Sequence, residues 1–330
     1  MPAPLSPALP HPSARRAVAV LALVSAAALI PLLGPSAALR DTGEAAAPGA
    51  GGTGLLRTVL FAALCVPAGE FLCARLVRRV PDAPRAGAPR SLAPWAAVAG
   101  FAAALALASV VAAGNLVPDR LDQIDLGGLY RTRDGSLALL EVNAFLAAGV
   151  CALSRRPSLR LWPPAAVVVA EALRAHPTTE HGALTGSGLT LVHLTCAALW
   201  AGGLPAVLRT VRRWRGVPGA GAALLGLYAR VAAVLLAAIT ATGVWSSLRR
   251  MPTDTILGQL TTTAYGRALL AKLLLVAVVA TLALMARRRL RHAADPLSAC
   301  SPARAEVAAL CLVVAVSGLL TALPPPIRWS

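Results

Sequence analysis

Long apolar stretches recur along the whole chain and limit its fold more than any other feature. An apolar stretch of about 17–25 residues is long enough to cross a bilayer as a helix, and the 330 residues contain about nine of them. They run over residues 17–39, 55–77, 92–114, 137–153, 160–176, 186–208, 222–246, 264–286 and 306–323. Because backbone polar groups inside lipid must bond to one another, the pattern predicts an all-α, polytopic transmembrane bundle of about nine helices.

The composition excludes a soluble enzyme with a large core. The chain is 57% hydrophobic and only 14% charged, well below the roughly 25% charged residues of soluble domains. In a soluble protein, the formal charge of +17 would favour a nucleic-acid partner. Here the arginines form short clusters between apolar stretches and lack interleaved aromatic residues. We therefore expect contact with the lipid bilayer and its anionic headgroups, and no nucleic acid.

The basic clusters alternate from one loop to the next, as positive-inside topology requires. They occupy the loops around residues 15–16, 75–90, 155–160, 209–215 and 287–304, and the acidic residues gather in the intervening loops. This predicts a multi-pass protein with residues 1–16 cytoplasmic and the C-terminus outside. The first stretch also has the pattern of a signal peptide, whose cleavage would leave about eight spans in the same orientation. Its length and Pro31 favour retention.

Several charged residues interrupt the apolar stretches, where a charge is costly and marks a candidate functional residue. On the predicted topology, Glu141, Glu171 and Lys272 lie toward the outer face, in an intramembrane polar network. They either neutralise one another or relay protons or ions, and the sequence leaves both open. Near the inner face, Glu70 and Arg230 lie at similar depth and are candidates for a buried structural pair.

Three histidines are expected at the outer level. His193 lies in the outer third of its stretch, and His176 and His181 lie in the loop before it. Imidazole is the commonest ligand of transition metals such as copper and zinc, so the three are candidate metal ligands. No HxxxH, HxH or CxxC pair accompanies them, and His193 as a packing residue with one hydrogen bond explains the local pattern equally well. The six cysteines are scattered and predict no disulfide framework.

Four segments carry a family resemblance. They are "LTLVHLTCAALWAGGLPAVL" (189–208), "LYARVAAVLLAAITATGVWSSL" (227–248), "QLTTTAYGRALLAKLLLVAVVATLALMARRRL" (259–290) and "SGLLTALPPP" (317–326). Together they resemble the copper-resistance protein D (CopD-type) family of bacterial inner-membrane proteins. The resemblance spans residues 185–326, about four helices, and follows about five helices in residues 17–184; residues 327–330 form a tail. The matching motif positions are His193, Trp200, Gly202, Gly203, Tyr265, Gly266 and Lys272.

The resemblance implies copper handling. It implies an inner-membrane protein that binds copper at its outer face and transports or delivers it, beside a periplasmic CopC-type carrier or a copper enzyme. The chain has only three methionines, a poor supply of soft ligands for Cu(I), so a membrane assembly factor for copper enzymes that moves no ion is an alternative. A b-type haem membrane protein is a further alternative, but it would need paired axial histidines inside the bundle, and only His193 is clearly placed there. No arrangement of catalytic residues indicates an enzyme.

Overall fold

The protein is a bundle of helices. The computed structural model describes residues 12–324 except 82, 85–88, 119, 155–156, 177–181, 252 and 293–299, and in that part of the chain every regular element is helical. The elements are α1 (Pro12–Leu39), α2 (Ala50–Val77), α3 (Ala93–Ala112), η1 (Leu121–Gln123), α4 (Leu126–Arg131), α5 (Arg133–Leu153), η2 (Pro157–Leu161), α6 (Trp162–Arg174), α7 (Ala183–Arg213), α8 (Pro218–Arg250), α9 (Ile256–Thr262), α10 (Ala264–His292) and α11 (Cys300–Leu320).

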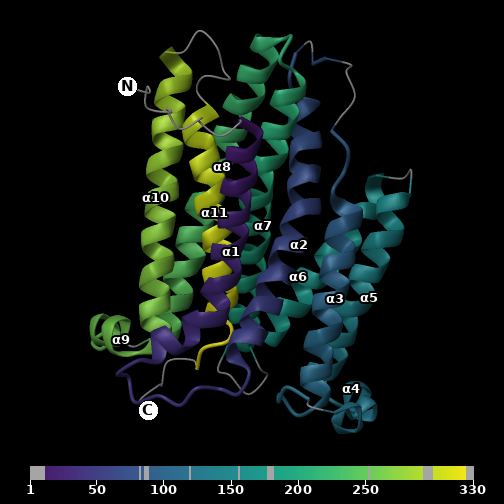
Figure 1. Ribbon diagram of the computed structural model, residues 1–330, viewed down its shortest axis with the longest axis vertical. Helices are drawn as coiled ribbons and strands as arrows, with labels where there is room; N and C mark the ends of the chain where they lie inside the picture. Colours follow the sequence, from purple (N-terminus) through teal and green to yellow (C-terminus); the bar gives the residue numbers. More distant parts are fainter. Residues whose placement is uncertain are drawn as a thin grey trace, which may run out of the picture.

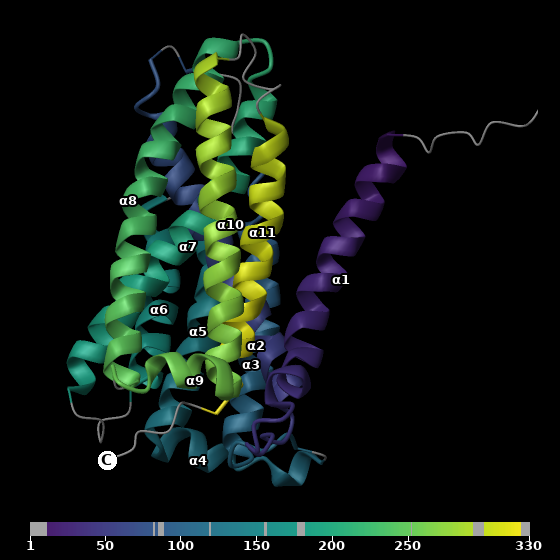
Figure 2. The same ribbon diagram turned by 90° about the vertical axis from the view of Figure 1, so that its left-hand side faces the viewer.

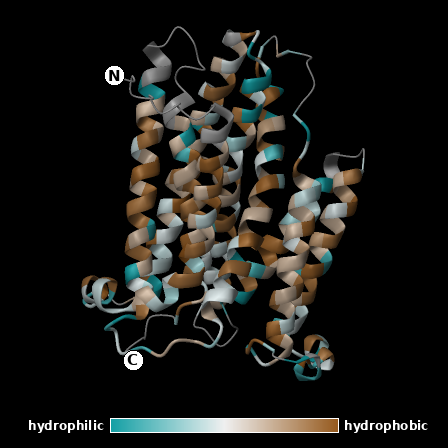
Figure 3. Cartoon of the chain, viewed as in Figure 1, coloured by the Kyte–Doolittle hydropathy of each residue, from teal (hydrophilic) through white to brown (hydrophobic). Residues whose placement is uncertain are grey.

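Eight of these helices are long and apolar enough to span a membrane. They are α1, α2, α3, α5, α7, α8, α10 and α11, and each contains an 18-residue window with a mean hydropathy of at least 1.7. Hydrophobic residues dominate their length, while hydrophilic residues are frequent at their ends and in the connections (Figure 3). The all-α, polytopic fold expected from the apolar stretches is confirmed.

Successive long segments run in opposite directions (Figure 1). Helices α2, α7 and α10 finish at the upper end of the bundle in this view, with arginines in and after their last turns. We call this the basic end. Helices α1, α3, α8 and α11 finish at the opposite end, where the short α4 and α9 also lie.

The fifth predicted stretch differs from the others. It folds as α6, whose 13 residues rise only about 20 Å, against the roughly 30 Å of a bilayer core. The sequence Trp162-Pro163-Pro164 explains its late start, because proline lacks the backbone N–H and is tolerated in a helix only in its first turn. The preceding residues form the short η2. Helix α6 still connects α5 to α7, so the alternation of directions is kept.

Helices α2 and α7 cross at the centre of the bundle and contribute to both large hydrophobic clusters. At the crossing, a methyl group on Gly69 would overlap the backbone of Gly202, and one on Gly202 would overlap the carbonyl of Cys65. Glycine is therefore required on both helices for this approach. Gly203, the next residue, faces the side chains of Tyr228 and Leu72.

Helix α1 packs on the bundle only through its second half. Pro31 is buried there, and Gly34 lies against the Leu319 side chain of α11. Toward the basic end, α1 diverges from the other helices (Figure 2), and large apolar side chains such as Val18 and Leu21 are exposed. An exposed apolar surface of this kind suits contact with lipid. The question of cleavage or retention of this segment stays a prediction.

Candidate functional site

Four charged residues meet between α2, α5 and α6 near the end opposite the basic end. Arg57 of α2 donates to Glu171 Oε1, and Arg174 Nη1 donates to Glu141 Oε2 at 2.9 Å. Arg174 Nη1 also lies 3.4 Å from Glu171 Oε1 within α6. We call Arg57, Glu141, Glu171 and Arg174 the charge quartet.

The charge quartet is buried and balanced. Glu141 is 1% exposed and Glu171 6%, while the two arginine side chains are each 13% exposed. A buried carboxylate without a partner would destabilise the fold strongly, whereas two arginines beside two carboxylates balance in formal charge. Glu141 Oε1 and Arg174 Nε and Nη2 are nevertheless buried without a hydrogen-bond partner among the described residues. The arrangement therefore suits a structural role, joining α2, α5 and α6.

The sequence did not lead us to Arg57 and Arg174 as members of this group. Arg57 lies near the outer end of the second predicted stretch, and Arg174 lies near the outer end of the fifth. A comparison of all charges by depth, arginines included, would have placed them beside Glu141 and Glu171. Lys272, the third residue of the expected network, lies on α10 and not within hydrogen-bonding distance of the quartet.

His193 lies in a second polar group, formed by α7, α8 and α10. Its Nδ1 lies 3.0 Å from Thr242 Oγ1 of α8. Lys272 of α10 is close enough to interact electrostatically with the imidazole. The ring also lies beside Gly243, where a methyl group would come within 3.6 Å of Cε1. We call His193, Thr242 and Lys272 the histidine group; both His193 and Lys272 are only partly buried.

Thr242 is the side-chain hydrogen-bond partner of His193 Nδ1. The Thr242 hydroxyl donates its proton to the backbone carbonyl of Ala238, at 2.7 Å, with the Ile239 carbonyl at 3.1 Å. A hydroxyl has a single proton, so when that proton bonds Ala238 the Thr242 oxygen accepts from His193 Nδ1. The imidazole also interacts with the backbone of Ile239. In the tautomer that has its proton on Nδ1, the Nε2 atom carries the lone pair that a metal ion would need.

His176 contacts α7 one turn before His193. It is 3% exposed, its Nε2 lies 3.0 Å from Thr190 Oγ1 of α7, and its ring packs against Gly186. Arg133 holds the loop in place, because its Nη2 donates to the carbonyls of Leu173, at 2.8 Å, and His176. Thr190 and His193 are three residues apart and so lie on neighbouring positions of one helix face.

The structure does not assemble a complete metal site from these residues. His181, the third expected ligand, lies outside the described residues. Among the residues that are described, no group of three or more His, Cys, Asp or Glu side chains is arranged to hold a metal ion. The assignment of His193, His176 and His181 as ligands stays a prediction.

The other motif residues organise helix packing and helix ends. Trp200 is buried, and its carbonyl accepts a 2.9 Å hydrogen bond from the Tyr228 hydroxyl of α8. Gly266 lies against the backbone of Gln259, and its N–H donates to Thr263 Oγ1 at 3.0 Å, which caps the start of α10. The neighbouring Tyr265 hydroxyl lies 3.4 Å from Arg250 Nη1.

The expected pairing of Glu70 with Arg230 is wrong. Glu70 accepts hydrogen bonds from Ser91 Oγ and the Leu92 N–H, at 2.5 and 2.7 Å, and lies 3.6 Å from Arg209 Nη1. Arg230 is exposed. The two residues lie on different helices, α2 and α8, and their similar predicted depth did not show which side chains meet.

Two family models match the chain. The model described as copper resistance protein D-like, N-terminal domain, matches residues 48–191, and the model described as copper resistance protein D matches residues 222–322. No match was found among curated proteins or among solved structures. The N-terminal match extends the resemblance well beyond residues 185–326.

The expected site residues divide between these ranges. Glu141, Glu171, His176 and His181 lie in the first, and Lys272 lies in the second with Tyr265 and Gly266. His193 and the Trp200 to Gly203 segment lie between them, on α7. Both descriptions name copper resistance protein D, and the two matches follow in chain order on a bundle of long apolar helices. The chain belongs to the copper resistance protein D family.

Proposed function

We propose that this protein binds copper at the end of the bundle opposite the basic end and transports or delivers it at the bacterial inner membrane. The observation that carries the proposal is the hydrogen bond from His193 Nδ1 to Thr242. In metal sites, the histidine nitrogen that does not bind the metal is usually held by such a partner, which fixes the ring and its tautomer. Family membership makes copper the metal to test.

In this proposal His193 meets the ion through Nε2, and His176 and His181 are the further ligands expected from the sequence. To bind an ion through Nε2, His176 would have to leave Thr190 Oγ1. Thr190, the partner of His176, is three residues from His193, so the ion passes along one face of α7. The positive charge of Lys272 beside the imidazole weakens the hold on a cation. Such a site favours transfer over storage, and the proposed activity makes and breaks no covalent bond of a substrate.

The proposed topology places the basic end in the cytoplasm and the histidine group toward the outside, because arginine-rich loops are retained inside. The N-terminus is then cytoplasmic and the C-terminus is outside. A CopC-type carrier or a copper enzyme outside the membrane is the proposed partner that supplies or receives the ion.

Copper accumulation in cells tests the proposal. Cellular copper is compared between cells without the protein and cells expressing the native chain, His193→Ala or the control Thr195→Ala at equal protein levels. Thr195 lies on the same helix, is exposed, and donates its hydroxyl proton back to the Leu191 carbonyl. We expect accumulation to change with the native chain and the control, and to return to the level of cells without the protein in His193→Ala.

Other outcomes separate the alternatives. If copper accumulation does not depend on the protein but the activity of a copper enzyme does, transport is refuted and an assembly factor is favoured. A Soret band in the purified protein, without bound copper, would refute both copper functions in favour of a b-type haem protein.

A further inference from the structure

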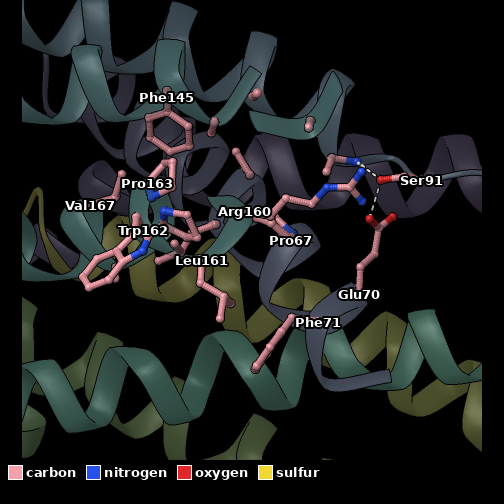
Figure 4. A pocket seen from close by; sticks show the side chains of 18 of the residues that line it. Pro67, Glu70, Phe71, Ser91, Phe145, Arg160, Leu161, Trp162, Pro163 and Val167 are labelled. Carbon is pink, nitrogen blue, oxygen red and sulfur yellow. Dashed lines mark hydrogen bonds between the residues drawn. The ribbon is translucent and has the colours of Figure 1, made fainter. Parts of the chain in front are cut away.

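The short α6 leaves a cavity at the basic end of the bundle. Because α6 begins only at Trp162, the short η2 is the described element that precedes it beside α2 and α5 toward the basic end. A cavity of about 680 Å³ lies beside these elements. Figure 4 shows Phe145, Trp162 and Val167 toward one side of it and Glu70 with Ser91 toward the other. Its size lies within the range of about 300–1,000 Å³ that is common for small-molecule sites.

The cavity is amphipathic. Alanine, leucine, proline and aromatic side chains form most of its lining, and three arginines, Arg75, Arg78 and Arg160, also line it. Two of the guanidinium groups are held in place. Arg160 Nη2 donates to the Ser154 carbonyl at 2.6 Å, and the Arg75 guanidinium carbon lies 5.0 Å from the centre of the Phe71 ring.

The charge of the cavity is positive. Glu70 also lines it, but this carboxylate accepts from Ser91 and the Leu92 N–H and has Arg209 as its ionic partner. The remaining three guanidinium groups therefore favour an anion. An apolar interior beside a cationic region, within a membrane-spanning bundle, matches an amphiphile with a negative headgroup and a hydrocarbon tail.

We propose that this cavity binds an anionic phospholipid, with its phosphate at Arg75, Arg78 and Arg160 and an acyl chain along the apolar wall formed by α2, α5 and the start of α6. The lipid replaces the half-helix that α6 lacks. The site is distinct from the histidine group at the other end of the bundle, and its occupation does not depend on copper.

Native mass spectrometry of the purified full chain tests this proposal. Phosphatidylglycerol and phosphatidylcholine with identical acyl chains are added in detergent, and the lipids retained per protein molecule are counted. We expect one phosphatidylglycerol to be retained at least about tenfold more strongly than phosphatidylcholine. Each arginine near a headgroup contributes about fivefold to affinity, so the triple variant Arg75→Gln, Arg78→Gln, Arg160→Gln loses on the order of 100-fold.

A matched control separates the cavity from general attraction to a basic surface. Arg212, Arg213 and Arg215 are three exposed arginines at the same end that do not line the cavity. Their triple change to glutamine is expected to retain the lipid. Equal losses in the two triple variants would overturn the proposal, as would a native chain that retains no phosphatidylglycerol.

A second variant tests the apolar part without touching the charges. Ala148 of α5 lines the cavity and is partly exposed, so Ala148→Trp fills space without replacing a core side chain. We expect this variant to lose retention of phosphatidylglycerol and to unfold at the same temperature as the native chain. Glycerol phosphate, which has the headgroup chemistry but no tail, should not displace the lipid. Retention by Ala148→Trp, or displacement by glycerol phosphate, would reduce the site to a surface phosphate contact and contradict the proposal.

Discussion

The charge quartet and the histidine group lie in the same half of the bundle but satisfy their charges differently. In the quartet, two arginines face two carboxylates, and the carboxylates are almost fully buried. In the histidine group, a partly buried imidazole contacts the Thr242 hydroxyl and the Ile239 backbone and lies near Lys272. Opposite charges in equal number join helices, whereas an imidazole beside a hydroxyl and a lysine has no carboxylate to pair with in its group and can offer a ring nitrogen to a ligand. The comparison favours a structural role for the charge quartet and makes the histidine group the place to test the proposed copper binding.

The largest effect is expected from breaking the charge quartet. Arg174→Met removes the partner of Glu141 and leaves more negative than positive charge in a buried site. We expect it to lower the free energy of unfolding in detergent by about 3–5 kcal/mol. The control is Arg131→Met, since Arg131 pairs with Asp125 where both side chains are more than half exposed; it should cost about 0–1 kcal/mol. Equal losses for the two variants would refute a structural quartet.

Removing both members of the pair should recover much of that loss. In Glu141→Leu, Arg174→Met, the pair of Arg57 and Glu171 remains balanced. Replacing a buried ion pair with apolar residues is often close to neutral, so we expect about 2 kcal/mol or more to return relative to Arg174→Met. Chemical denaturation of the single and double variants measures this coupling. A double variant as unstable as the sum of its single changes would show that the residues do not interact.

The crossing of α2 and α7 connects the two groups, because α2 carries Arg57 and α7 carries His193. Gly202→Ala forces these backbones apart and is expected to lower stability by about 1–3 kcal/mol, through overpacking. Gly226→Ala, where an added methyl group meets nothing within 4 Å, is the control and should be neutral or slightly stabilising. Thermal unfolding of both variants checks the difference; an unchanged Gly202→Ala would contradict the close approach.

The smallest effect on stability is expected at Thr242. Thr242→Val removes the hydroxyl that orients His193 while keeping the side-chain shape, and should cost about 1 kcal/mol of stability or less. Loss of a partner that orients a metal ligand typically weakens binding about 10–100-fold. We therefore expect copper affinity to fall at least about tenfold, measured by competition with a chelator. Thr195→Val, on the exposed face of α7, should leave the affinity unchanged.

The sequence predicted the positions of the helices better than the side-chain pairs between them. The apolar stretches located the long helices, because length and hydropathy are local properties. The short length of α6 was harder to predict, because two prolines within an otherwise apolar stretch set where the helix begins. The depth of Glu141 and Glu171 indicated a shared level, but the rotation of each helix decides which charges meet. For that reason Arg57 and Arg174 were missed, and Glu70 was paired with Arg230 in place of Arg209.

Copper bound per molecule of purified protein tests the central claim most directly. It is measured for the native chain, for His193→Ala, and for the quartet variant Glu141→Leu, Arg174→Met, all checked for folding. We predict that His193→Ala loses bound copper, while the quartet variant keeps the native amount. Copper retained by His193→Ala and lost from the quartet variant would contradict the account, because it would move the metal from the histidine group to the charge quartet.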